Sequence, residues 1–350
     1  MDSDKIVPLN NDSRRCVVFH TDSDDYRCLV ILTVKRATGT FSLIGCVFML
    51  FVIWLLRRYH SLAQKMICSL TVAAFFDSVA YVMGDSHPEG SLCSFQAWWL
   101  TYFDWSALAW VCLITVNLYL NLVKEMSTTR YQLLYHMIAW GVPLVMAFLP
   151  LFFGCYGPAG AWCWITDDHI AWRFGIWYVP LFTLIFLMIC CYTRIIYVAN
   201  ERMQSWFGTF NPERERRKVS LAEEIKPLKW YPSVYLLVSL FPLINRLHNA
   251  FYPQDPIFFL TLLHVLSAPL HGLANAFVFG LDRDMWSQLT PTGIQVALQS
   301  RLCDSTRIGE YHPGAVRYTK ADLGDFSEDD DDDTNVLFFS PDMTLKDRGP

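Results

Sequence analysis

Six ionisable side chains interrupt stretches of the sequence that are otherwise apolar, and these residues are the most able to do chemistry. They are Asp77, Asp104, Arg246, His248, His264 and His271. A charge at the middle of a lipid bilayer costs about 3 kcal/mol or more unless it is paired or hydrated. Such residues therefore indicate either an ion pair within the protein or a polar ligand site.

Asp104 and Arg246 are the main candidates for a ligand site. Asp104 lies eleven residues after Cys93, which corresponds to roughly 16 Å along a helix. We expect Asp104 and Arg246 to face a central cavity, where they either pair with each other or offer an anion and a cation to a ligand. His248, two residues after Arg246, is assigned to the same candidate site.

Aromatic side chains accompany these charges. Trp98, Tyr102 and Trp105 are spaced by four and three residues, so they form one stripe on a helix. If the stripe points inward, it builds an apolar pocket that tolerates cations, and we add Trp164 to it. The alternative is packing in the core or in the aromatic belt at the membrane interface.

The other polar side chains predict an internal network. Asp77 is expected to contact Asn275, and Asn245 belongs to the same proposed activation network. Pro242 joins it because proline frees backbone carbonyls and allows a helix to kink. The alternative is ordinary interhelical hydrogen bonding, worth about 1 kcal/mol per contact. His264 and His271 share a helix face, but a metal would need further ligands, and no metal or cofactor is predicted.

Seven apolar stretches must position these residues. Each reaches the roughly 20 residues that cross a bilayer as a helix, and 53% of the chain is hydrophobic while only 17% is charged. Because a lipid core offers no water to backbone groups, the sequence predicts an all-α membrane protein, a seven-transmembrane helix bundle. The stretches are residues 37–56, 66–84, 95–123, 131–153, 172–198, 228–250 and 257–280.

Three regions follow from this pattern. Residues 1–36 are interpreted as an extracellular N-terminal tail, and residues 37–286 as the membrane domain with a short amphipathic helix after the last span. Residues 287–350 are interpreted as a disordered acidic cytoplasmic tail.

The distribution of Lys and Arg predicts the orientation. Three of the six connections between spans carry eleven basic residues, and the three connections on the opposite side, 85–92, 154–171 and 251–256, carry none. Because positive loops stay in the cytoplasm, the N-terminus is predicted outside and the C-terminus inside. Asn11 begins a glycosylation sequon, which is used only on the outer side.

The cysteines suggest how an outer loop is held. Cys93 stands at the outer end of the third stretch and Cys163 in the second outer loop. A disulfide between them would pin that loop over the mouth of the bundle. Cys16, Cys28 and Cys155 also lie on the outer side, and their pairing stays open.

Four short segments resemble the cyclic-AMP-receptor-like family of G-protein-coupled receptors, known from slime moulds with relatives in fungi and animals. They are Trp140-Gly141-Val142-Pro143-Leu144, Trp162-Cys163-Trp164-Ile165, residues 241–246 and residues 271–276. The resemblance covers about residues 37–286. Asp-Arg-Tyr, Cys-Trp-x-Pro and Asn-Pro-x-x-Tyr, the motifs of rhodopsin-like receptors, are absent, so we do not transfer their switch residues. Cyclic AMP itself is not predicted, because the outer cavity would offer chiefly one cation.

The resemblance implies a multi-pass receptor of the plasma membrane that binds an extracellular ligand and activates a heterotrimeric G protein. Its expected G-protein contacts are Arg57, Arg58, Lys124, Arg194, Arg214, Arg216, Arg217, Lys218 and Lys229. Retention of the loops by positive charge and contact with anionic lipid explain the same residues. Ser220 follows basic residues as a kinase site would, and the tail carries candidate sites for kinases and an arrestin-type partner, or simply solvated residues.

Other classes of membrane protein fit less well. A retinal protein needs a lysine in residues 257–280, and none is present. A transporter would often show an internal repeat, and none is visible in the sequence. Neither a channel filter nor an enzymatic constellation is recognisable, and nothing predicts a nucleic-acid partner. The alternative function is a seven-helix transporter or a membrane protein that does not signal.

Overall fold

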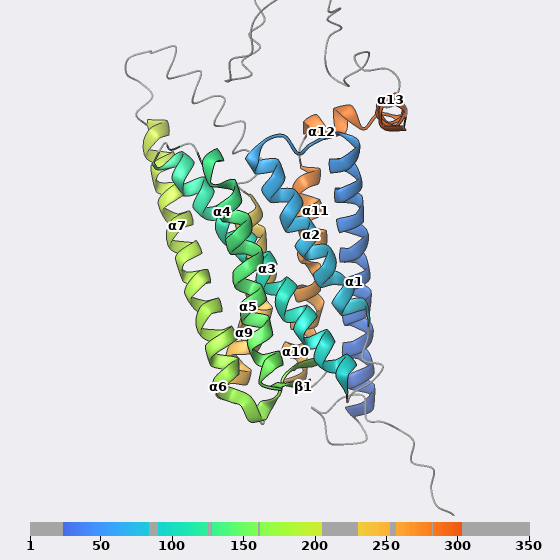
Figure 1. Ribbon diagram of the computed structural model, residues 1–350, viewed down its shortest axis with the longest axis vertical. Coiled ribbons are helices and arrows are strands. Elements are labelled where there is room, and N and C mark those ends of the chain that lie inside the picture. Colours follow the sequence, from blue (N-terminus) through green and yellow to red (C-terminus); the bar gives the residue numbers. More distant parts are fainter. Residues whose placement is uncertain are drawn as a thin grey trace, which may run out of the picture.

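The computed structural model describes residues 24–83, 90–124, 126, 128–159, 162–204, 230–252, 257–281 and 283–302. These residues form an upright bundle of helices, with a two-stranded hairpin at one end and the short helices α12 and α13 at the other (Figure 1). We call these the hairpin end and the α13 end.

The helices follow one another up and down the bundle. The first three are α1 (Asp24–Leu55), α2 (Leu62–Met83) and α3 (Ser91–Leu122), followed by α4 (Gln132–His136) and α5 (Val142–Phe152). Next come α6 (Ile170–Trp172), α7 (Val179–Gln204) and α9 (Trp230–Phe251). The last four are α10 (Phe258–Ser267), α11 (His271–Gly280), α12 (Arg283–Gln288) and α13 (Pro291–Leu302).

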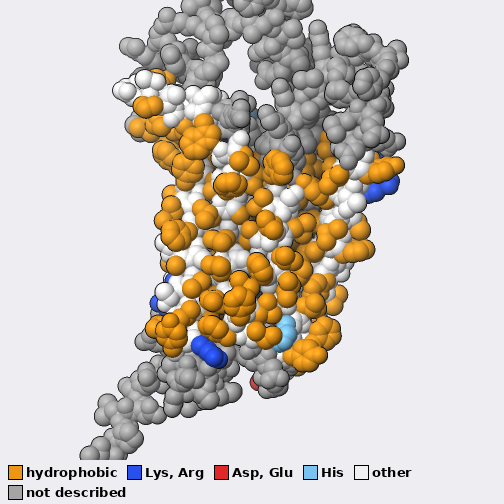
Figure 2. Space-filling view, turned by 180° about the vertical axis from the view of Figure 1, so that it is seen from behind, with side chains coloured by type: hydrophobic (Ala, Val, Ile, Leu, Met, Phe, Trp, Pro, Cys, Tyr) orange, Lys and Arg blue, Asp and Glu red, His pale blue; other side chains and the backbone are white. Residues whose placement is uncertain are grey.

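Within the described ranges, six helical segments are long and apolar enough to cross a membrane, which confirms the prediction of a helical membrane protein. They are Tyr26–Leu55, Leu62–Met83, Ser91–Leu122, Thr129–Phe152, Ile170–Val198 and Phe258–Gly280. Hydrophobic side chains cover the middle of the face seen in Figure 2, and Lys and Arg appear toward its ends. The helix α9 packs against α3, α10 and α11. Its role as a seventh span stays a prediction, since Asn245, Arg246 and His248 make it more polar.

Prolines explain why several helical segments change locally to π or 3₁₀ geometry without ending. A π-helical turn, Met137–Gly141, precedes Pro143 in α5, and another, Arg173–Tyr178, precedes Pro180 in α7. Pro269 lies in the 3₁₀ turn between α10 and α11. Proline lacks an N–H and crowds the carbonyl one turn earlier, and such local turns relieve that crowding while the helix axis continues.

Both ends of the helical region extend beyond the predicted limits. The helix α1 begins at Asp24, upstream of the apolar stretch that starts at residue 37. Lys35 interrupts the hydrophobic pattern but is buried. The helix α13 forms within the segment predicted to be disordered from residue 287. Arg301 holds it against α1, because its guanidinium lies 5.3 Å from the Trp54 ring centre and donates to the Trp54 carbonyl.

The hairpin closes one end of the bundle. Its strands, β1 (Tyr156–Pro158) and β2 (Cys163–Ile165), pair antiparallel with Tyr156 opposite Ile165. Gly154, at a φ of 66°, ends α5 in a left-handed conformation that favours glycine, and the chain turns directly into β1.

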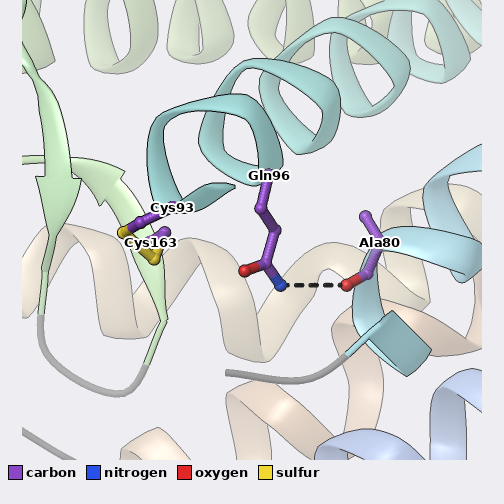
Figure 3. Close-up of a disulfide and its surroundings, with 4 residues drawn as sticks. All are labelled: Ala80, Cys93, Gln96 and Cys163. Carbon is purple, nitrogen blue, oxygen red and sulfur yellow. Dashed lines mark hydrogen bonds between the residues drawn. A yellow bond between two sulfur atoms is a disulfide. The ribbon is translucent and has the colours of Figure 1, made fainter. Parts of the chain in front are cut away.

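The Cys93–Cys163 disulfide, with Cα atoms 5.4 Å apart, ties β2 to the start of α3 (Figure 3). Next to it, Gln96 of α3 donates to the Ala80 carbonyl of α2 at 3.2 Å. The predicted disulfide is therefore confirmed. Cys28 is also disulfide-bonded, whereas Cys155 is a buried free thiol.

The core runs along α3, which contacts α2, α5, α7 and α9. Trp110 of α3 is fully buried, with its ring 4.9 Å from His136 and 6.1 Å from Trp140. This central position explains why α3 contributes to the cavity described below. Several residues singled out in the sequence lie outside the described ranges: Asn11, Cys16, Arg214, Arg216, Arg217, Lys218, Ser220 and Lys229.

Candidate functional site

A cavity of about 40 Å³ lies between the helices toward the hairpin end. The helix α3 contributes Asp104 and Trp105, and α9 contributes Arg246. Since a buried water needs about 10–15 Å³ in this measure, the cavity has room for about three waters. His264 and His271, from α10 and α11, border it on another side.

Arg246 is held by aromatic rings. Its guanidinium carbon lies 4.1 Å from the centre of the Trp164 ring and 5.0 Å from that of Trp177. Arg173 approaches the same Trp164 at 5.3 Å and donates two hydrogen bonds to the Ile165 carbonyl, at 2.9 and 2.6 Å. Cation–π contacts therefore connect α9 to the hairpin that the disulfide pins to α3.

Asp104 and Arg246 interact electrostatically and line the same cavity, but no ion pair joins them within the described part of the chain. The Trp177 ring packs edge-on against Trp105 at 5.2 Å and Trp164 at 5.5 Å, which fixes the aromatic wall beside Arg246. The side chains of Asp104 and Arg246 thus border one small cavity without a direct bond between them. Both side chains are partly buried, and a charge withdrawn from water without a partner is costly, so this arrangement can receive a polar ligand.

The two histidines are positioned by hydrogen bonds. Asn245 Nδ2 lies 2.7 Å from His264 Nδ1. His271 Nδ1 lies 2.5 Å from the Ala268 carbonyl oxygen, and its Nε2 lies 3.1 Å from Ser239 Oγ. These contacts link α9 to α10 and α11. No group of three or more His, Cys, Asp or Glu side chains within the described ranges is suited to hold a metal.

The predicted aromatic stripe on α3 is divided between two surroundings. Trp105 lines the cavity. Trp98 and Tyr102 do not line it: they stack on each other at 5.9 Å, with Phe148 near Trp98 at 5.2 Å and Trp140 near Tyr102 at 6.4 Å. Their face of α3 therefore meets α5 and the turn before it.

Two other predicted ligand residues lie beside the cavity. Trp164 contacts Arg246 from the hairpin but is not itself part of the lining. His248 also lies outside it, with its ring 5.5 Å from Tyr252 near the end of α9.

Tyr235 and Ser239 are cavity residues that sequence reasoning missed. They precede Arg246 by eleven and seven residues on α9. These separations are close to three and two helical turns, so all three side chains share one face. The helical spacing counted back from Arg246 would have identified them.

The polar network between helices differs in detail from the predicted one. Asp77 Oδ1 is buried and makes no hydrogen bond in the described region, and no bond joins Asp77 to Asn275. The Ser78 and Ser42 hydroxyls lie 3.0 Å apart, and Ser42 accepts the Leu273 N–H at 3.3 Å. Pro242, a third member of the predicted network, lines the cavity.

Basic side chains collect at the α13 end. Lys124 follows α3, and Arg194 lies in the second half of α7 with its guanidinium carbon 6.0 Å from the Tyr197 ring centre. Arg57 and Arg58 follow α1. Arg57 ends that helix at a φ of 51° and Arg58 N–H donates to the Ile53 carbonyl at 3.0 Å, a helix-ending motif in which glycine is usual.

Residues 21–299 match the family model described as slime mold cyclic AMP receptor. The chain belongs to this family.

Individual relatives agree with that membership. Cyclic AMP receptor-like protein A of Dictyostelium discoideum is 25% identical over 246 residues, which are 70% of this chain and 62% of that protein. G-protein coupled receptor 1 of Arabidopsis thaliana is 23% identical over 72% of this chain and 78% of its own length. G-protein coupled receptor 157 of Homo sapiens is 24% identical over 63% and 71%. The match spans about three fifths of cyclic AMP receptor-like protein A and of cyclic AMP receptor 1.

The cavity lies within the part of the chain that matches the slime mold cyclic AMP receptor family. The chain is thus a multi-pass membrane protein of this family. The segment Trp162-Cys163-Trp164-Ile165, which carried the resemblance in the sequence, supplies both the disulfide and the indole on Arg246. The resemblance and the geometry of the site therefore rest on the same residues.

Proposed function

We propose that this chain is a receptor of the plasma membrane that binds an extracellular ligand in the charged cavity and activates a heterotrimeric G protein. In this proposal α9 is the seventh span, the hairpin end is extracellular and the α13 end is cytoplasmic. The basic connections at the α13 end and the absence of Lys and Arg from the opposite loops support this orientation. Membership of the slime mold cyclic AMP receptor family supports the function.

The observation that carries the proposal is the placement of two opposite charges on two different helices around one cavity. Asp104 belongs to α3 and Arg246 to α9, and Trp164 of the disulfide-linked hairpin contacts Arg246. A ligand that contacts both charges binds one arrangement of α3 and α9 better than another. Such differential binding is what shifts a conformational equilibrium.

The helix α9 is the moving element in this mechanism. Pro242 lies inside α9, one turn before Arg246, and removes one backbone hydrogen bond at that point. A ligand that pulls Arg246 would change the bend at Pro242 and move the other end of α9. Coupling between the two ends is mutual, so a bound G protein would raise the affinity for the ligand by the same factor.

The G-protein surface is proposed at the α13 end. It comprises Arg57, Arg58, Lys124 and Arg194 together with the basic third loop, which lies outside the described residues. Phosphorylation at Ser220 and in the tail would add negative charge there and favour an arrestin-type partner. Glycosylation at Asn11 is proposed for the opposite side.

The proposal is tested by measuring calcium and cyclic AMP together in cells that express the full chain, without ligand and with a ligand panel. Replacing Arg214, Arg216, Arg217 and Lys218 with Ala should reduce the signal at equal surface expression. Arg246→Gln should abolish the ligand-dependent part. Arg36→Gln, at an exposed position on α1, is the matched control and should leave both unchanged. Transport of a labelled solute without any second-messenger change would overturn the proposal in favour of a transporter.

A further inference from the structure

The size of the cavity limits what it accepts. Its volume is about 40 Å³, and an adjoining cavity of about 10 Å³ is bordered by Arg246, Trp162 and Leu100. Arg246 therefore borders both spaces, together with Tyr81, His264 and Ala268. Both spaces are small, which limits the ligand to a small molecule. A nucleotide is far larger than these spaces.

The charges around the cavity determine the polarity of the ligand. Among the described residues that line the larger cavity, Asp104 is the one acid and Arg246 the one Lys or Arg. Asp77, a second buried acid, interacts electrostatically with Asp104 but does not line the cavity. One side of the space is thus negative and the other positive.

The geometry of Arg246 leaves its hydrogen-bond donors available. Trp164 and Trp177 approach the guanidinium by their rings, at 4.1 and 5.0 Å. The N–H groups of a guanidinium lie in its plane and suit the two oxygens of a carboxylate. Rings that hold the guanidinium restrict its motion and leave such a bidentate contact possible.

The histidines do not change the balance of one negative and one positive charge around the cavity. Both ring nitrogens of His271 and Nδ1 of His264 already lie within hydrogen-bond distance of protein groups. A ligand with only a negative charge would neutralise Arg246 but leave Asp104 without a partner. A ligand with only a positive charge would do the reverse. Either leaves a partly buried charge uncompensated, which is unfavourable.

We propose that the cavity binds a small zwitterion, with its acid group on Arg246 and its ammonium group on Asp104, as an ω-amino acid would present them. The proposal names the ligand class of the receptor site and so rests on the proposed function. It also makes a claim about binding alone, which is measurable without a G protein.

The test uses the purified full-length chain and four probes of increasing length: glycine, β-alanine, γ-aminobutyrate and 5-aminovalerate. Butyrate and n-butylamine carry only one of the two charges and serve as ligand controls. Thermal unfolding and binding of the tritiated probes are measured. One chain length should stabilise the protein best, and the singly charged compounds should bind about 100-fold more weakly or worse.

Two variants give a readout that a merely structural role would not produce. Asp104→Asn removes the negative wall, so preference should move from the zwitterion to butyrate. Arg246→Gln removes the positive wall, so preference should move to n-butylamine. Arg36→Gln should keep the zwitterion preference of the wild type.

The outcomes separate this inference from the proposed function. If no ω-amino acid stabilises the wild-type chain, or if butyrate and n-butylamine bind as well as the zwitterions, the ligand class is wrong even where cells still signal. If an ω-amino acid binds with the expected reversals but no second messenger responds, the ligand class stands and the proposed function fails.

Discussion

The polar groups toward the two ends of α3 have different surroundings. Toward the hairpin end, Asp104 faces Arg246 across a cavity, and no ion pair joins them in the described part of the chain. Toward the α13 end, the Thr128 hydroxyl lies 2.5 Å from Asn117 Oδ1 and 3.2 Å from Asn121 Oδ1, and all three residues are buried. The first region is charged and open to a partner, and the second is neutral and satisfied internally.

This difference separates a region that can bind a ligand from a region that stabilises the fold. Buried charges without a direct partner reduce stability unless a ligand compensates them. Neutral polar groups that bond to each other add stability at modest cost. Rhodopsin-like receptors carry an ionic motif at the end of the third helix, whereas this chain holds the start of its next connection with Thr128 and two asparagines. Substitutions at the two ends should therefore affect different properties.

The largest effect is expected from removing the disulfide at the hairpin end. Replacing Cys93 and Cys163 together with Ser removes the covalent link between α3 and the hairpin that carries Trp164. Loss of a native disulfide typically costs about 2–5 kcal/mol of unfolding free energy. We expect a lower unfolding temperature and loss of ligand binding, measured on the purified chain.

Cys190→Ser, at an exposed free cysteine on α7, is the control and should change neither property. Ligand binding that survives the double substitution would mean that the hairpin does not organise Arg246, and the contrast between the two ends would weaken.

Gly272→Ala should have the next largest effect, and it should lower the stability of the whole helix bundle. Its added Cβ would overlap Cys46 Sγ and stand 2.5 Å from Ser42 Oγ and 3.1 Å from the Ser42 carbonyl oxygen. The helices α1 and α11 must then move apart, which costs about 1–3 kcal/mol. Thermal unfolding of the purified chain measures this loss.

Gly141→Ala is the matched control, since a Cβ there meets nothing within 4 Å. It should be neutral or slightly stabilising. An equal loss of stability in the two variants would show that the close contact of α1 with α11 is not what glycine serves at residue 272.

The arrangement of helices was largely predictable because the bilayer imposes it. Apolar stretches of sufficient length must form helices, since no other structure satisfies their backbone groups in lipid. One large difference, the early start of α1 at Asp24, arises at Lys35 and Arg36. A hydropathy pattern places the end of a membrane span at two adjacent charges. A helical backbone nevertheless continues through charges whose side chains find suitable surroundings.

The candidate site was predictable only in part. Intramembrane charge identified Asp104 and Arg246, which do line one cavity. Helical spacing placed Trp98, Tyr102 and Trp105 on one stripe but contained no information on which neighbour each part of the stripe would meet. The contacts of Arg246 with Trp164 and Trp177 join residues at least 69 positions apart. No local pattern reports such contacts, because they depend on how the helices pack.

A smaller effect is expected at the neutral end of α3. Thr128→Val keeps the shape of the side chain but removes the hydroxyl that contacts Asn117 and Asn121. Leaving buried polar groups without that partner costs about 1–3 kcal/mol. The unfolding temperature should fall by a few degrees while zwitterion affinity stays within about twofold.

Thr129→Val, at the next residue and exposed, should be silent in both assays. A large loss of ligand affinity in Thr128→Val without a loss of stability would contradict the separation of the two ends. It would place the asparagine cluster in the conformational switch rather than in the support of the fold.

The smallest effect is expected at Ser78 of α2, next to the buried Asp77. Ser78→Ala removes the hydroxyl 3.0 Å from Ser42, while Ser42 keeps its contact with the Leu273 N–H. Interhelical hydrogen bonds in membranes are worth about 0.6 kcal/mol on average, so a double-mutant cycle with Ser42→Ala should give a coupling near that value. Ser69→Ala, on the same helix, makes no side-chain hydrogen bond in the described region and should show none. A coupling above about 2 kcal/mol would mean that the contact between Ser78 and Ser42 supports the fold well beyond an ordinary interhelical hydrogen bond. Neutral polar support would then be strong beside the charged region as well, and the contrast between the two regions would weaken.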